Sequence, residues 1–196
     1  LLEIATPDVY RRNAFRVTGQ SVDVNSRELE RHAEKARMRE RLGMPSEPIG
    51  GPLPLDPPPD AEGIREATLR LRDSEKRLAE EFFWFWPMTP GRSASDEALQ
   101  ALSEGRPHAA VKEWRKHAYV NPDALSQEVL PDGVETHNLA VLWHAITLEW
   151  DLDLEDEEEN TSYWQLAHQA WATVVDGWSL WEDFRDRVEA KEEARL

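Results

Sequence analysis

The sequence contains no cysteine among its 196 residues. Disulfide bonds, thiolate catalysis and zinc sites with cysteine ligands are therefore excluded. Cations are also scarce, because 23 lysines and arginines face 39 aspartates and glutamates, for a formal net charge of −16. A nucleic-acid backbone is held by clustered cations. We therefore expect no nucleic-acid partner.

Long apolar segments are absent as well. No apolar run approaches the roughly 18 residues that a membrane-spanning helix needs. No leader of basic and then apolar residues is visible either. The sequence therefore predicts a cytoplasmic protein that makes no membrane contact.

The common catalytic motifs are missing. The nine glycines form no phosphate-binding loop or dinucleotide fingerprint, and neither Gly-x-Ser-x-Gly nor His-Glu-x-x-His occurs. We therefore predict no enzyme, no metal and no cofactor. A metal-dependent enzyme is the alternative, with Glu113 and His117, one helical turn apart, or His137 and His144, two turns apart, as candidate ligands.

One acidic run can be compared with a calcium-binding loop. Residues 151–159 hold seven acids in nine positions. A calcium loop of the EF-hand type needs glycine at its sixth position and glutamate at its twelfth, where this chain has Asp156 and Ser162. We interpret the run as a mobile acidic loop, with docking to a basic partner as the alternative.

The chain divides by charge and by proline. Residues 1–86 hold 14 bases and 16 acids, whereas residues 87–196 hold 9 bases and 23 acids. Seven of the 13 prolines lie in residues 45–59, which are therefore neither helix nor central strand. We predict two domains, residues 1–88 with a proline-rich loop at 45–59, and residues 93–196.

Helix signals dominate the first domain. One helix is predicted from its cap Thr6 to Thr18, and a second begins at Asn25, where Glu28 completes a capping box, and ends before Gly43. Asp60 and Asp73 begin two more. The third helix has an apolar stripe of Ile64, Ala67, Thr68 and Leu71. The fourth is expected to end in a buried turn made of the five aromatics at 82–86.

The second domain also shows helical periodicity. Apolar residues recur with a spacing near 3.6 in residues 95–104, 107–120, 134–150 and 162–192. Alternation with a period of two, which is typical of strands, is nearly absent. The fold class is therefore predicted to be all-α.

Two blocks in the first domain resemble a J domain, the co-chaperone module of Hsp70 systems. They are Asn13–Gly19 with Val24–Leu29, and Ile64–Ala67 with Leu71–Arg77. The resemblance implies a J-like helical domain. J domains stimulate Hsp70 through a His-Pro-Asp tripeptide, which this chain lacks. A degenerate J-like domain can keep the fold without the activity.

The second predicted helix carries a basic stripe. Arg27, Arg31 and Lys35 repeat every four residues and so share a face. In J domains this face docks on the ATPase, which makes the three residues candidate partner-binding positions. A solvated face laced by glutamate–arginine pairs is the alternative interpretation.

Patterns in the second domain resemble tetratricopeptide (TPR) repeats. Ala110-x3-Trp114 and Ala167-x3-Trp171 resemble the second helix of a repeat, and Asn138–Trp143 resembles a first helix. No 34-residue period survives. The resemblance implies a TPR-like helical bundle.

Tryptophan is unusually frequent for so polar a chain. Trp164, Trp171 and Trp178 are seven residues apart, and Trp181 follows three later. This spacing favours a helical core. An aromatic groove for a partner is the alternative, for which Trp178 and Trp181 are the candidate binding residues.

The sequence therefore predicts a non-enzymatic adaptor or scaffold subunit of a larger assembly, with protein partners. An Hsp70-like or other ATPase, bound through the second helix, is the alternative partner. A metal-dependent enzyme is the second alternative.

Overall fold

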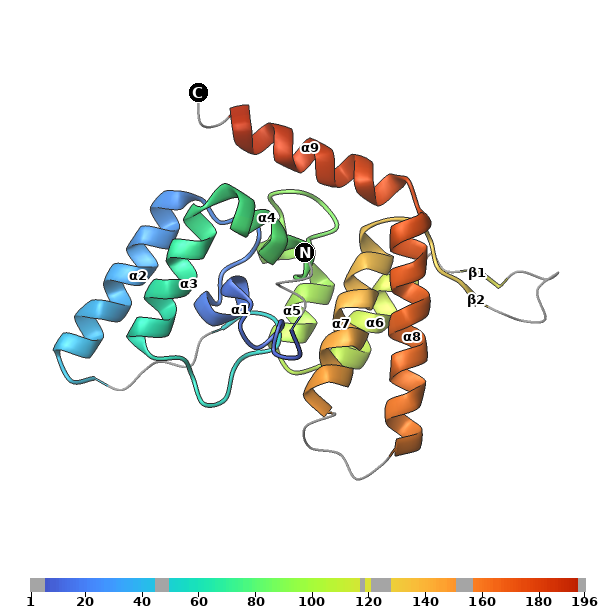
Figure 1. Ribbon diagram of the computed structural model, residues 1–196, viewed down its shortest axis with the longest axis horizontal. Coiled ribbons are helices and arrows are strands. Elements are labelled where there is room, and N and C mark those ends of the chain that lie inside the picture. Colours follow the sequence, from blue (N-terminus) through green and yellow to red (C-terminus); the bar gives the residue numbers. More distant parts are fainter. Residues whose placement is uncertain (1–5, 45–49, 117–118, 121–127, 151–156, 194–196) are drawn as a thin grey trace. The chain divides into compact units, whose positions relative to one another are not determined.

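The computed structural model describes residues 6–44, 50–116, 119–120, 128–150 and 157–193. In this part of the chain the fold is all-α, as predicted, with nine α-helices, one short 3-10 helix and one pair of two-residue strands (Figure 1). The chain divides into two compact units, Leu1–Ala110 and Val111–Leu196. Each unit is described separately below.

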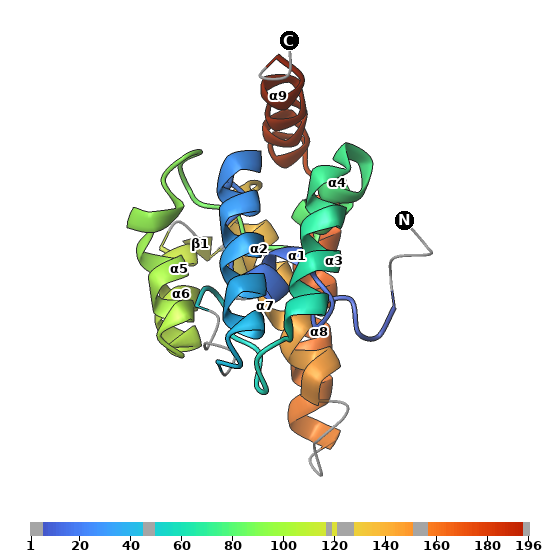
Figure 2. The same ribbon diagram turned by 90° about the vertical axis from the view of Figure 1, so that its left-hand side faces the viewer.

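The first unit is built around two long helices, α2 (Ser26–Arg41) and α3 (Ala61–Arg72), which lie side by side (Figure 2). The short helices α1 (Ala14–Thr18) and α4 (Ser74–Phe82) pack on α3. The unit ends with the 3-10 helix η1 (Ser93–Ser95), α5 (Glu97–Ser103) and the start of α6 (Pro107–Trp114).

Side-chain caps begin these helices where the sequence predicted. The Asn25 side chain accepts a hydrogen bond from the Glu28 N–H, and the Glu28 carboxylate accepts one from the Asn25 N–H. Asp60 caps α3 and Asp73 caps α4 in the same local manner. The predicted inward stripe of α3 is confirmed, because its buried residues are Ile64, Ala67, Thr68 and Leu71.

The prediction for the first helix is wrong at its start. Residues 7–11 form turns, and α1 begins only after Asn13, whose side chain accepts from the Phe15 N–H. The amide of Asn13 also donates to the carbonyls of Glu80 and Phe83, at 2.8 and 3.2 Å. These tertiary bonds select Asn13 as the cap over Thr6.

The aromatic run does not form a helical turn. Helix α4 ends at Phe82, and the buried Trp84, Phe85 and Trp86 follow in an irregular segment. The indole Nε1 of Trp86 donates to the Glu81 carbonyl at 2.8 Å, which uses an acceptor at the helix end. The expected burial is therefore confirmed for these three rings, but not the expected helix.

Residues 89–110 belong to the first unit, whereas the sequence placed a boundary near residues 87–93. The Ser93 hydroxyl donates to the Asp23 carboxylate at 2.5 Å, and the Ser93 N–H donates to the same oxygen. These bonds join η1 to the segment before α2.

The described part of the proline-rich segment, residues 50–59, has no helix or strand, as predicted. The Arg16 guanidinium donates to the Leu53 carbonyl at 2.6 Å. Gly51 has a φ of +106°, and a Cβ there would lie 3.3 Å from the Gly19 carbonyl oxygen. A side chain at residue 51 would therefore disturb the packing of this segment on α1.

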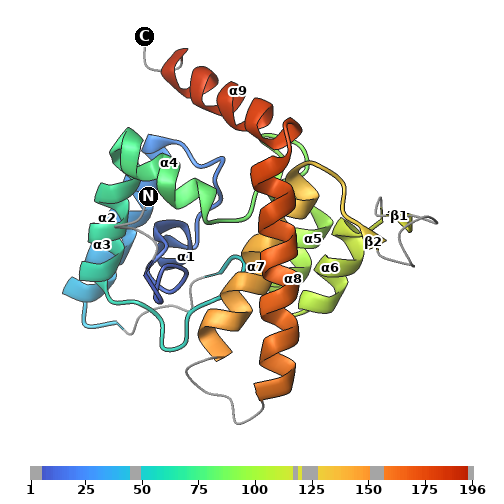
Figure 3. The ribbon, with the colours of Figure 1, turned by 45° about the vertical axis from the view of Figure 1, so that its right-hand side comes forward.

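The second unit contains a long helical pair. Helices α7 (Val134–Trp150) and α8 (Glu157–Asp176) run side by side, and α9 (Ser179–Glu193) leaves the end of α8 at an angle (Figure 3). The strands β1 (Tyr119–Val120) and β2 (Glu128–Val129) pair antiparallel. Residues 139–143 of α7 are apolar and all buried, so this stretch of the helix is enclosed on every side.

Two predicted helices differ from the structure. Helix α6 ends at Trp114 and not at residue 120. The long helix predicted over 162–192 is two helices, because Gly177 and Trp178 are not helical and separate α8 from α9. The Asp132 carboxylate accepts the N–H groups of Trp178 and Ser179, both at 2.8 Å, and so begins α9 there.

Among the helices of the described residues, none combines the length and the apolar character needed to cross a membrane.

Candidate protein-binding surfaces

A groove of about 510 Å³ lies between α2 and α3 in the first unit. It is lined by five arginines, two glutamates and three uncharged residues. The residues are Arg27, Glu30, Arg31, Ala33, Glu34, Arg37, Arg65, Thr68, Leu69 and Arg72. The lining therefore carries three more positive than negative groups, although the whole chain is strongly acidic.

Three of these five arginines are held in ion pairs. The pairs are Arg37 with Glu34 at 3.4 Å, Arg65 with Glu62, and Arg72 with Glu30 at 2.6 Å. Arg27 and Arg31 are exposed and have no ion pair with any carboxylate of the described residues. The groove thus keeps two unneutralised guanidinium groups, both on α2.

The groove also contains an apolar side chain. Leu69 is 50% exposed, because the inward stripe of α3 leaves residue 69 on the opposite face of the helix. A surface that combines free arginines with an exposed leucine suits a ligand that has both carboxylates and apolar groups.

Lys35, the third residue of the predicted basic stripe, lies elsewhere. It lines a separate cavity of about 320 Å³ together with His32, Arg39 and Ile64. Burial, and then the nearby Lys35 ammonium, lower the pKa of His32. The structure therefore brings Arg27 and Arg31 together but assigns Lys35 to a different surface, because a step of four residues turns about 40° around the helix each time.

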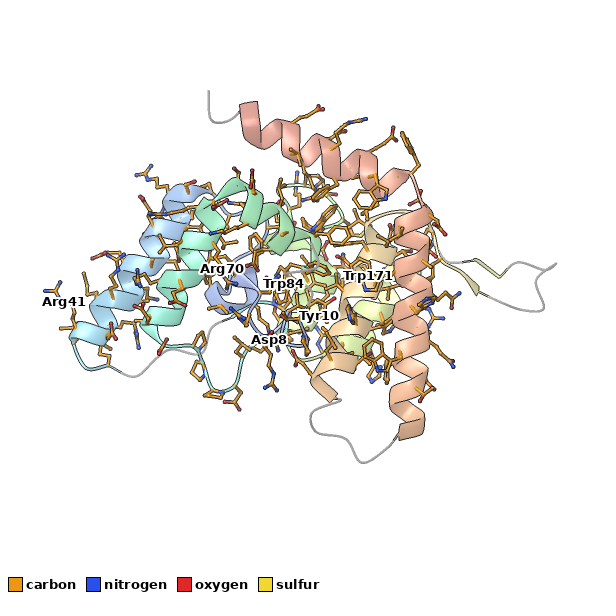
Figure 4. All side chains as sticks on the ribbon, viewed as in Figure 1. Asp8, Tyr10, Arg41, Arg70, Trp84 and Trp171 are labelled. Atoms are coloured by element: carbon orange, nitrogen blue, oxygen red, sulfur yellow. The ribbon has the colours of Figure 1, made fainter. Side chains whose placement is uncertain are left out.

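Helix α2 is fixed by both of its faces. Leu29 and Ala33 are buried on the inner face. The Glu30–Arg72 pair joins its outer edge to α3. Arg41 lies at the opposite end of α2 from Arg27 (Figure 4).

The second candidate surface lies at the junction of α8 and α9. Trp178 is 68% exposed, Val175 is 60% exposed and Trp181 is 38% exposed. The Trp181 indole Nε1 donates to the Val175 carbonyl at 3.4 Å, and its ring meets Phe184 edge-on with centroids 6.2 Å apart. We call Val175, Trp178 and Trp181 the elbow surface. It contains both tryptophans that the sequence proposed for partner binding.

The backbone of the elbow surface is fixed from a distance. The Asp132 carboxylate accepts hydrogen bonds from the N–H groups of Trp178 and its neighbour Ser179. A Cβ at Gly177 would lie 2.2 Å from an Asp132 carboxylate oxygen. The connection between α8 and α9 therefore depends on glycine at position 177 and aspartate at position 132. It holds the Trp178 ring in solvent rather than in the core.

Tryptophans farther back on α8 have a structural role. Trp171, labelled in Figure 4, lies on α8. Its ring meets His137 and His144 of α7 edge-on, with centroids 5.9 and 6.3 Å apart, and the Trp164 ring lies 5.7 Å from that of His144. Burial lowers the pKa of His144. The two histidines proposed as metal ligands are thus packed against indole rings.

The structure describes the other proposed metal ligands only in part. Glu113 forms an ion pair with Lys116, while His117 and residues 151–156 of the acidic run lie outside the described residues. Within the described ranges, no three histidine, aspartate or glutamate side chains lie close enough to share a metal ion.

Comparison with known proteins identified no relative. No family model, no curated protein and no solved structure matches this chain.

Sequence reasoning missed several residues of these surfaces. Arg65, Leu69 and Arg72 could have been found, because their spacing of four and three residues puts them on the outward face of the predicted third helix. Asp132 left no local signal, since it is 46 residues away from Trp178 in the chain.

Proposed function

We propose that the chain is a non-enzymatic adaptor, a scaffold subunit that binds other proteins in a cytoplasmic assembly. One observation carries this proposal: Arg27 and Arg31, both exposed and unpaired among the described residues, line the same groove as the exposed Leu69. Protein interfaces combine an apolar centre with polar groups at the rim. An acidic, partly apolar protein surface is the complementary partner.

The test compares charge reversals on one helix. The full chain is used to capture partners from cell extract. Arg27→Glu/Arg31→Glu should reduce the capture of a stoichiometric partner about tenfold or more, because two favourable charge contacts become repulsive. Lys35→Glu is the matched control, since it lies on the same helix but outside the groove. The proposal fails if the wild-type chain retains no protein in stoichiometric amount.

A measurement of the free energy of unfolding is the control for this experiment. Both arginines are exposed, so the double reversal should change the free energy of unfolding by less than about 0.5 kcal/mol. A loss of capture by a variant with unchanged stability therefore reports on binding rather than on folding.

A co-chaperone role is the second candidate. The J-like blocks and the exposed Arg27 and Arg31 on α2 support docking to an Hsp70-like ATPase, even though His-Pro-Asp is absent. Docking of this kind should weaken as salt increases. Binding of such an ATPase that is insensitive both to salt and to Arg27→Glu/Arg31→Glu would remove this candidate.

A further inference from the structure

We infer that the elbow surface binds a cationic, partly apolar segment of a partner protein. This inference rests on the proposed adaptor function and names the chemistry of the partner at its second surface. Exposed aromatic area, a fixed backbone and negative surrounding charge occur together at this surface.

The exposed apolar area is concentrated. Val175, Trp178 and Trp181 fall within seven residues of the chain and are three of the nine large apolar side chains exposed in the described residues. Indole rings are enriched among the residues that contribute most to protein binding. A surface of this kind is suited to receive an apolar partner side chain.

The geometry of this surface is set before any partner arrives. The Asp132 carboxylate accepts hydrogen bonds from the N–H groups of Trp178 and Ser179, and it lies so close to Gly177 that a side chain there would clash with it. A fixed aromatic anchor loses less conformational entropy on binding than a mobile one.

The surrounding charge selects the partner. Among Asp132, the end of α8 and residues 179–189 of α9, six carboxylates stand against two arginines: Asp132, Asp176, Glu182, Asp183, Asp186 and Glu189 against Arg185 and Arg187. Arg185 is already paired with Asp186 at 3.1 Å. Burial raises the pKa of Asp183, and the carboxylates of Asp186, Glu182 and Asp132 raise it further, while Arg187 opposes them.

This negative field excludes acidic partners and favours lysine or arginine beside the apolar anchor. An indole face also attracts a cation directly. The elbow surface and the α2–α3 groove therefore select partners of opposite charge.

The experiment measures the binding of a labelled amphipathic helical peptide made of leucine and lysine to the full chain by fluorescence anisotropy. A peptide with glutamate in place of each lysine is the charge control. We expect the lysine peptide to bind, with affinity that falls as salt rises, and the glutamate peptide to bind at least tenfold more weakly.

Variants then separate the aromatic surface from net charge. Trp178→Ala/Trp181→Ala should weaken lysine-peptide binding about tenfold or more at unchanged net charge. Trp164→Ala is the matched control, because Trp164 is also 38% exposed but lies near the other end of α8. Trp178→Ala alone provides the test if the double variant does not fold.

The inference is overturned if the tryptophan variants bind the lysine peptide as tightly as the wild type, because net charge alone would then explain the binding. It is also overturned if the wild-type chain self-associates through the elbow surface, seen as a molar mass that rises with concentration and falls in Trp178→Ala. Peptide failure together with successful partner capture would refute this inference and leave the adaptor function standing.

Discussion

The two units begin their helices in different ways. In the first unit Asn25, Asp60, Asp73 and Asp96 each accept an N–H from a residue at most three positions ahead. In the second unit the start of α9 is held by Asp132, 46 residues before Trp178. Local caps make these four helix starts predictable from sequence, whereas the start of α9 depends on a contact that exists only after folding.

The interiors differ as well. In the first unit Arg77 is almost buried and binds the fully buried Glu81 at 2.8 Å. In the helical pair of the second unit, His137 and His144 of α7 contact the indole rings of Trp171 and Trp164 on α8. A charge pair and a set of edge-on and tilted ring contacts respond differently to substitution and to pH. Four predictions test the comparison between the two units.

The largest effect is expected from Arg77→Met. The Arg77 guanidinium also donates to the carbonyls of Val22 and Val24, at 2.9 and 2.8 Å, and lies over the Phe15 ring. Its removal leaves the Glu81 carboxylate buried without its guanidinium partner, which should cost about 3–5 kcal/mol. Denaturant unfolding followed by circular dichroism measures this change in the free energy of unfolding.

The matched control for Arg77 is Lys76→Met. Lys76 is exposed and pairs with Asp73 at 3.7 Å, so its loss should cost less than about 1 kcal/mol. Equal effects of the two substitutions would contradict the interpretation of Arg77 and Glu81 as the polar centre of the first unit.

The next largest effect is expected from Gly177→Ala in the second unit. The new Cβ would lie 2.2 Å from the Asp132 carboxylate and 2.8 Å from the Thr173 carbonyl oxygen. Relief requires a backbone shift or loss of the two Asp132 bonds, which should cost about 1–3 kcal/mol. Thermal unfolding measures the loss.

Asp132→Ala tests the cause of this clash. The substitution should itself destabilise the chain, because it removes both bonds to the start of α9. The double variant should lose less stability than the sum of the two single losses, since the carboxylate that Cβ meets is gone. Strict additivity would show that Gly177 is needed for another reason.

A smaller effect is expected from Asn25→Ala in the first unit. The substitution removes the side-chain half of the capping box of α2 and should cost about 1 kcal/mol. Asn25→Ser should retain most of the stability, because a serine oxygen can also accept the Glu28 N–H. Indistinguishable losses for alanine and serine would argue against the local-cap interpretation.

The success of prediction from sequence follows the distinction between local and long-range contacts, in both units. The bounds of α2 and the inward residues of α3 could be predicted because capping and helical periodicity are local. The start of α1 could not, since Asn13 is selected by carbonyls of Glu80 and Phe83. The break at Gly177 was missed for the same reason.

The candidate binding surfaces could also be predicted only in part. The sequence identified Arg27 and Arg31, which the groove brings together, and Trp178 and Trp181, which are exposed together at the elbow. Periodicity alone grouped Lys35 with the arginines. The structure instead places Arg27 and Arg31 in the groove and Lys35 in a separate cavity.

The smallest expected effect is a pH dependence in the second unit. Burial between Trp164 and Trp171 lowers the pKa of His144 from its ordinary value of 6.5. Between the lowered pKa and about 6.5, the unfolded chain binds more protons at this residue than the folded chain. The contribution of His144 to stability is therefore full above about 6.5 and falls as the pH drops through that window.

Replacement of His144 by glutamine should remove this contribution and flatten the fall in stability below pH 6.5. The change in the free energy of unfolding should be smaller than the loss expected for Asn25→Ala. His168→Gln is the matched control, because His168 is exposed on the same helix that supplies Trp164 and Trp171. Unfolding free energies of the three proteins, compared across the window, check the sign. If His144→Gln steepens the fall, the imidazole is stabilised in its charged form by the indole faces, and a cation–π contact rather than desolvation dominates the interior of the second unit.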